Sequence, residues 1–131
     1  MIKSRFIYDV LDLLLDGDDD GMLAQNQLPF LTDAEFEYSN EGLFVHFSYD
    51  DRIENHKIAT EDLVLSGVLI QTDEYPIQAD AAVFFADGKI DYLDIWCHYG
   101  DYPEKDLTRY TLTQLWDNDF PGRVITTEMQ P

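Results

Sequence analysis

The chain has 131 residues, of which 45% are hydrophobic and 14% aromatic. This length and this supply of apolar side chains predict a single domain, residues 1–131, and argue against intrinsic disorder. Eight lysines and arginines stand against 27 aspartates and glutamates, which gives a net charge of −19. Direct binding to nucleic acid or to an anionic membrane is disfavoured because both are polyanions. The charge favours a basic partner, a cation or simply solubility.

Cysteine usage and targeting signals indicate the compartment. The single cysteine, Cys97, excludes an intrachain disulfide and a multi-cysteine zinc site. The apolar run over residues 10–15 is interrupted by Asp12, and no small-residue cleavage site follows it. The longest uncharged and largely apolar stretch, residues 63–72, is about half of a membrane span. We therefore expect a cytoplasmic protein with a reduced thiol and no membrane partner.

The first predicted element is an amphipathic helix over residues 4–15, for which Ser4 is a suitable N-cap. Its apolar face consists of Phe6, Ile7, Val10, Leu11 and Leu14. Gly17 is placed to end this helix, and the Asp-rich residues 16–21 predict a loop. Pro29 is expected to stop any long helix that follows.

Residues 34–39 and 43–49 predict a hairpin, because both segments are rich in aromatic residues and valine and a polar turn separates them. Alternation places Phe36 and Tyr38 on one face of the first strand. In the second strand, the residues expected to share a face are Phe44, His46 and Ser48.

The next segment is expected to contain a turn, a short strand and a short helix. Asp50 and Asp51 predict the turn, and residues 52–58 the strand. Thr60 followed by two acidic residues suits a helix N-terminus, and this helix would end at Ser66-Gly67.

The clearest hairpin joins residues 79–86 to residues 89–97 through Asp87-Gly88, a pair suited to a type I′ turn because both positions need positive φ. The pairs expected from a regular register are Phe85 with Ile90, Val83 with Tyr92 and Ala81 with Asp94. Residues 108–116 predict a further strand, and a helix beginning near Pro103 is the alternative. The expected class is α+β, an N-terminal helix packed on a mainly antiparallel sheet of about five to six strands.

The Asp-rich segment is a candidate cation site. Asp16, Asp18 and Asp20 fall at positions 1, 3 and 5 of an EF-hand-like loop, and Gly21 falls at position 6. Ca²⁺ needs oxygen ligands converging from such a loop, but Gln27 stands where the bidentate carboxylate belongs. A solvated acidic loop is the favoured interpretation. A Ca²⁺ site with these three aspartates as first ligands remains the alternative.

No catalytic constellation is expected. Cys97 and His98 are adjacent, so in a strand they point to opposite faces and cannot form a nucleophile–base pair. Asp91 and Asp94 are likewise expected on opposite faces of one strand. The sequence contains no nucleophile elbow, phosphate-binding glycine loop or dinucleotide fingerprint. We therefore predict no enzymatic activity, while a carboxylate pair formed by the tertiary fold stays open.

Aromatic and acidic residues are interleaved near the C-terminal third of the chain. The aromatic members are Tyr92, Trp96, Tyr99, Tyr102, Tyr110 and Trp116. We expect most of Tyr92, Trp96 and Trp116 to lie in the core, and Tyr99 and Tyr102 to be exposed in a loop beside Gly100 and Pro103. Exposed tyrosines surrounded by acids suit a basic protein surface. The expected partner-binding residues are Tyr99, Asp101, Tyr102, Glu104 and Asp106.

Residues 82–96 (AVFFADGKIDYLDIW), followed by Gly100-Asp101-Tyr102-Pro103, resemble the central hairpin of small acidic bacterial immunity proteins. These proteins accompany the toxins of polymorphic-toxin and contact-dependent growth inhibition systems. The resemblance implies a cytoplasmic bacterial protein that binds and neutralises one cognate toxin, often a nuclease with a basic active site. The family has no shared catalytic motif, so no residue role is transferred by position.

Composition and resemblance together predict a non-enzymatic acidic protein that neutralises a basic protein partner, as an immunity protein does for a toxin. The alternatives are a nucleic-acid mimic that blocks a DNA-binding protein, and a Ca²⁺-binding or small enzymatic domain.

Overall fold

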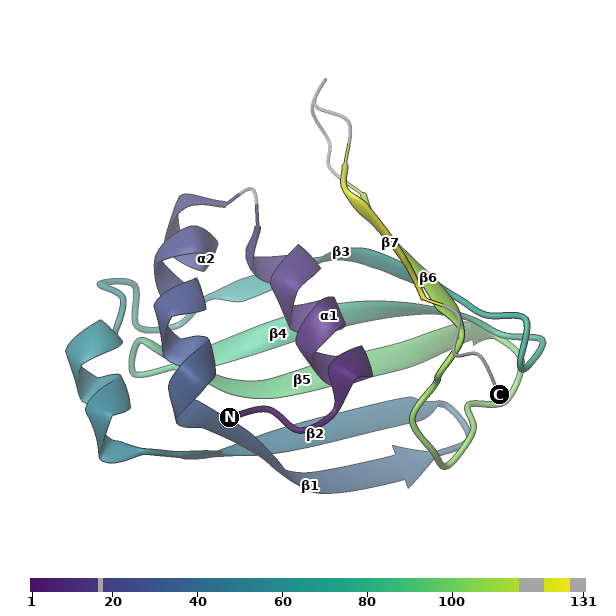
Figure 1. Cartoon of the computed structure of the whole chain (residues 1–131), viewed down its shortest axis with the longest axis horizontal. Coiled ribbons are helices and arrows are strands. Elements are labelled where there is room, and N and C mark those ends of the chain that lie inside the picture. Colours follow the sequence, from purple (N-terminus) through teal and green to yellow (C-terminus); the bar gives the residue numbers. More distant parts are fainter. Residues whose placement is uncertain (17, 116–121, 128–131) are drawn as a thin grey trace.

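A seven-stranded sheet and an N-terminal helix organise the part of the chain that this computed structural model describes, residues 1–16, 18–115 and 122–127 (Figure 1). The helical elements are α1 (Arg5–Leu15), α2 (Asp19–Ala24) and the 3-10 helices η1 (Gln25–Phe30) and η2 (Asp51–His56). The strands are β1 (Leu31–Ser39), β2 (Gly42–Tyr49), β3 (Val64–Gln71), β4 (Gln78–Ala86), β5 (Lys89–Tyr99), β6 (Tyr110–Gln114) and β7 (Val124–Thr127).

The strands form one sheet in the order β1-β2-β5-β4-β3-β6-β7, and every neighbouring pair is antiparallel. α1 lies across one face of this sheet and contacts β3, β4 and β6 (Figure 1). The predicted α+β class is confirmed. The strand count is seven instead of five or six, because β3 replaces a predicted helix and β7 is a further strand, while the strand predicted over residues 52–58 does not form.

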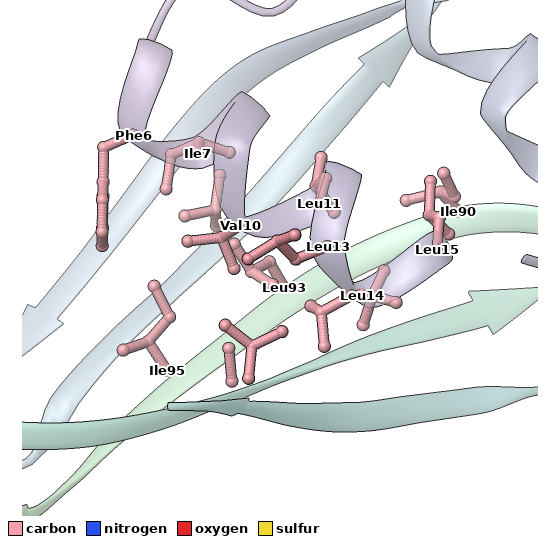
Figure 2. Packing of buried hydrophobic residues seen from close by; sticks show 14 of the residues in the cluster. Phe6, Ile7, Val10, Leu11, Leu13, Leu14, Leu15, Ile90, Leu93 and Ile95 are labelled. Atoms are coloured by element: carbon pink, nitrogen blue, oxygen red, sulfur yellow. The ribbon is translucent and has the colours of Figure 1, made fainter. Parts of the chain in front are cut away.

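α1 forms as predicted and supplies much of the core. The Ser4 hydroxyl accepts a hydrogen bond from the Ile7 amide, which caps the first turn. Figure 2 shows the buried side chains of α1 pointing toward those of β5. The fully buried members of this layer are Ile7, Val10, Leu11, Leu13, Leu14, Leu15, Ile90 and Leu93. The predicted helix end at Gly17 lies outside the described residues.

The β4–β5 hairpin turns at Asp87 and Gly88, whose φ values of 53° and 74° confirm a turn with two positive φ angles. Phe85 pairs with Ile90 as predicted, but the next pair is Phe84 with Tyr92. β5 therefore carries one extra residue, Asp91, and this bulge moves the pairs from Phe84–Tyr92 to Ala79–Cys97 by one position. The predicted pairs of Val83 with Tyr92 and Ala81 with Asp94 are wrong for this reason.

Two predicted elements between β2 and β4 are also wrong. Residues 51–56 form η2 instead of a strand, because the Asp50 carboxylate accepts from the Arg52 amide and caps a helical turn. The helix predicted from Thr60 is absent from this part of the described chain, where β3 begins at Val64. The apolar residues of β3 suit a buried strand. Gly67, with φ of 104°, lies at a bulge of this strand.

Candidate partner-binding site

The predicted binding loop is only partly exposed. Tyr99 is 64% exposed, and Asp101 and Glu104 are also exposed, as the prediction requires. Asp106 is half-buried, and one of its carboxylate oxygens is buried without a hydrogen bond in the described part of the chain. Burial, followed by the charges of Asp106 and Glu104, raises the pKa of the Tyr38 phenol.

Tyr102 is a core residue, so its predicted exposure is wrong. The side chain is 4% exposed and its ring stacks on that of Tyr38, with a centroid separation of 6.4 Å. Its amide donates a hydrogen bond to the Asn40 carbonyl, which ties the loop to the β1–β2 turn. Burial raises the pKa of the Tyr102 phenol far above its usual range. Gly100 and Pro103 do flank a loop, as predicted, but the Tyr102 side chain between them is buried in the core.

A larger exposed surface lies on the face of the sheet opposite α1, which no helix covers in the described portion of the chain. Three neighbouring strands, β2, β5 and β4, present three side-chain positions each on this face. Register alignment places them in three rows, which are His46–Tyr92–Phe84, Phe44–Asp94–Ala82 and Gly42–Trp96–Asp80. We call these nine residues the open-face patch.

Aromatic rings dominate the open-face patch. Phe84 and Tyr92 are stacked, with ring centroids 4.6 Å apart and planes 5° apart. The ring centroids of Phe44 and His46 lie 6.1 and 6.0 Å from that of Tyr92. Phe44 is 42% exposed and Trp96 is 37% exposed. The expectation that Trp96 lies in the core is therefore wrong, and Tyr92 is half-buried on the same face. Trp116 lies outside the described residues.

The carboxylate of Asp94 occupies the centre of the patch. It forms no hydrogen bond or ion pair with any residue that the structure describes, and partial burial raises its pKa. Carboxylates also lie around it, since Asp80 is a member of the patch and Glu37 pairs across the sheet with Phe44. An aromatic surface with a central unpaired carboxylate is complementary to a cationic protein surface.

Most of the basic residues of the chain are already paired with acids elsewhere. The lysines and arginines found in ion pairs are Arg5, Arg52, Lys57, Lys89, Lys105, Arg109 and Arg123. Their partners include Asp50, whose pKa is lowered to about 2 by hydrogen bonds from Arg52. None of these ion pairs involves the patch, so its acids face solvent without a lysine or arginine partner in the described residues.

Cys97 and His98 diverge as predicted. His98 is on the open face beside the patch, where its Nε2 lies 2.6 Å from an Asp80 carboxylate oxygen. Cys97 packs against the core on the other face, and burial, followed by the charge of Asp101, raises the pKa of its thiol. A protonated thiol turned away from the imidazole is a poor nucleophile, so this pair supports no covalent chemistry.

The three aspartates of the Ca²⁺ alternative have separate structural contacts. Asp18 caps α2 by accepting from the Gly21 amide, and Asp16 pairs with Arg123 at 3.0 Å. Asp20 accepts a hydrogen bond from the Thr60 hydroxyl. Asp18 is therefore a helix cap, and residues 19–21 form the first turn of α2. Within residues 1–16, 18–115 and 122–127, no three His, Cys, Asp or Glu side chains group closely enough to hold a metal ion.

One hollow of about 350 Å³ lies away from the patch, near the end of β3 and β6. Thr72, Arg109 and Thr111 contribute to its lining. The Arg109 guanidinium at this hollow is paired with Asp73 at 3.6 Å, so the charge that would attract an anion is already compensated. The open-face patch, with its unpaired charge and exposed rings, is the stronger candidate.

The sequence contains a signal for this patch. Along β5, Leu93 and Ile95 alternate with Tyr92, Asp94, Trp96 and His98. The alternation assigns the first set to the core, so the aromatic residues that share a face with Asp94 and His98 must lie on the solvent side. The prediction missed this because a regular register from the Asp87-Gly88 turn places Tyr92 on the same face as Ile90.

Comparisons with protein-family models, curated proteins and solved structures return no match to this chain. In the segments that the structure describes, no helix is both long and apolar enough to cross a membrane.

Proposed function

We propose that this chain is a non-enzymatic, cytoplasmic protein that binds and neutralises a basic protein partner through the open-face patch. The single observation that carries the proposal is an uncovered sheet face with exposed aromatic rings around an unpaired carboxylate, in a protein of net charge −19. Aromatic residues provide rigid contact area at interfaces, and opposite charge accelerates association. A flat surface of this kind suits a protein more than a small molecule, which prefers a concave site.

The partner we propose is a bacterial toxin domain, such as a nuclease, for which this chain is the immunity protein. A nuclease that binds a polyanion needs a basic cleft, and an acidic protein that covers the cleft would exclude the substrate. This identification draws on the resemblance of residues 82–96 to immunity-protein hairpins, in addition to the charge. The open-face patch explains how such a protein gains affinity beyond long-range attraction.

The test is co-expression with the product of the gene immediately upstream of this one. We expect that product to arrest bacterial growth, and the chain to relieve the arrest by forming a complex with it. Relief should be lost in the double variant Phe44→Ala/Trp96→Ala, with a folded protein confirmed by circular dichroism. Asp51→Asn, at an exposed position outside the patch, is the matched control and should retain relief.

Two outcomes would overturn the proposal. In the first, the upstream product neither arrests growth nor binds the chain. In the second, the double variant relieves the arrest as well as the wild type does. If the bound partner is a DNA-binding protein that DNA displaces competitively, the nucleic-acid mimic is the correct alternative.

A further inference from the structure

The structure points to a specific chemistry for the centre of the patch. We propose that Asp94 is the anchor for an arginine side chain of the partner, which stacks on the neighbouring aromatic rings while its guanidinium pairs with the carboxylate. This inference rests on the proposed function and names the chemical group that the same surface recognises.

The surroundings of Asp94 provide aromatic rings on the same face. Phe44 lies directly across on β2, and Tyr92 and Trp96 lie two residues before and after Asp94 on β5. Directly opposite residues on adjacent antiparallel strands have Cβ atoms about 4.5–5.5 Å apart, so Phe44 and Asp94 are cross-strand neighbours on this face. Cations are attracted to the faces of aromatic rings, and tryptophan is the strongest of these.

The other side of Asp94 carries the smallest residues of the patch. Its neighbour on β4 is Ala82, which presents a methyl group, and the neighbour of Trp96 on β2 is Gly42, which has no side chain. Ala82 is 3% exposed and Gly42 is buried, so an incoming arginine would reach the carboxylate from the solvent side, beside the exposed rings of Phe44 and Trp96.

No lysine or arginine among the described residues is placed to fill this position. Seven of the lysines and arginines are in ion pairs elsewhere in the described residues. The eighth, Lys3, precedes α1, and its amide bonds to Asp33 near the start of β1. The carboxylate of Asp94 is partly removed from water without a compensating charge, and a cation from another molecule would supply one.

Arginine fits this position better than lysine. Its planar guanidinium stacks on aromatic rings and can make two parallel hydrogen bonds to one carboxylate. The ammonium of lysine is more strongly hydrated and offers neither the stacking nor the paired geometry. Arginine is also enriched among the residues that dominate binding energy at protein interfaces.

The first experiment titrates the full-length, ¹⁵N-labelled chain with the peptide acetyl-Gly-Arg-Gly-amide. We expect saturable NMR shifts of the amides of Tyr92, Asp94 and Trp96 and of the Trp96 indole. The neutral citrulline peptide should bind at least tenfold more weakly than the arginine peptide. The lysine peptide should bind about threefold more weakly than the arginine peptide. Asp94→Asn should abolish the preference for arginine over citrulline, whereas Asp51→Asn should leave it unchanged. Equal binding of the arginine and citrulline peptides, or no shift at the patch, would overturn the arginine anchor.

The second experiment separates this inference from the proposed function by using the intact partner. Asp94→Asn should weaken the complex at least tenfold, and Asp51→Asn less than twofold. If Phe44→Ala/Trp96→Ala disrupts the complex while Asp94→Asn does not, the patch binds the partner but arginine recognition is wrong. If neither variant affects the complex, the proposed function of the patch fails with it.

Discussion

The two faces of β5 show how one strand serves both folding and binding. Toward α1 it presents Leu93 and Ile95, which are almost fully buried. Toward the uncovered side it presents Tyr92, Asp94 and Trp96, which combine exposed ring surface with a partly buried charge. The covered face gains stability from removing apolar area from water. The open face leaves apolar area in water and a carboxylate without a partner, so it does not gain this stability in the isolated protein. Such a surface is expected where another protein binds.

The first way to test this contrast concerns Tyr102, which sequence reasoning assigned to the binding surface and the structure assigns to the core. Tyr102→Ala should lower the free energy of unfolding by about 3–5 kcal/mol, because it removes a buried aromatic ring. Tyr102→Phe should be nearly neutral, since the phenol oxygen has no hydrogen-bond partner among the described residues. Urea denaturation measures both. A Tyr102→Ala protein of wild-type stability would place this side chain at the surface.

The second prediction compares the covered and open faces directly. Leu11 on α1 is fully buried, so Leu11→Ala should cost about 2–5 kcal/mol of unfolding free energy. Trp96→Ala on the open face should cost clearly less, because the ring is already partly hydrated. Thermal and urea unfolding of the two variants would check the ranking. The contrast between the faces fails if Trp96→Ala is the more damaging substitution.

The third prediction concerns the turn that joins β4 to β5. Gly88 has a φ of 74°, and a Cβ atom there would lie 2.5 Å from the Ile58 carbonyl oxygen. Gly88→Val should destabilise the fold by about 1–3 kcal/mol through backbone strain, with the steric overlap adding to this. Asp87→Asn is the control, because asparagine tolerates positive φ. Equal unfolding midpoints for the two variants would contradict the turn geometry.

The fourth prediction concerns Asp94→Asn, for which we expect the smallest change in stability. Burial raises the pKa of Asp94 above its unfolded value, so this group favours folding when protonated and loses that contribution as pH rises through its folded pKa. Asp94→Asn should therefore be as stable as the wild type or slightly more stable at neutral pH. The difference should disappear under acidic conditions, where the wild-type carboxyl is protonated. A clear loss of stability at neutral pH would mean that Asp94 has a structural partner.

The sequence predicted the elements whose signals are local. Ser4 and the apolar stripe defined α1, and Asp87-Gly88 defined the central hairpin. The bulge at Asp91 was not predictable from the turn alone, because it depends on how β5 packs against both neighbours. β3 was mistaken for a helix because the capping signal at Thr60 outweighed the apolar strand pattern that follows.

The predicted binding loop and the open-face patch share an acidic and aromatic character but lie at different positions in the fold. An acidic and aromatic surface for a basic partner was expected, and Tyr99, Asp101 and Glu104 are exposed as predicted. Their role in binding stays a prediction, and they lie at the end of the strand that carries the patch or after it. Tyr102 was misplaced because a residue between Gly100 and Pro103 looks like a loop tip, whereas its burial depends on the distant Tyr38.

Cross-saturation NMR of the complex tests the central claim most directly. The chain is deuterated and ¹⁵N-labelled, the unlabelled basic partner is irradiated, and the loss of amide signal in the chain reports proximity to the partner. The open-face proposal predicts the largest losses at residues 42–46, 80–84 and 92–98, with α1 unaffected. Losses centred on residues 99–106 with little effect on the patch, or losses centred on α1, would contradict it.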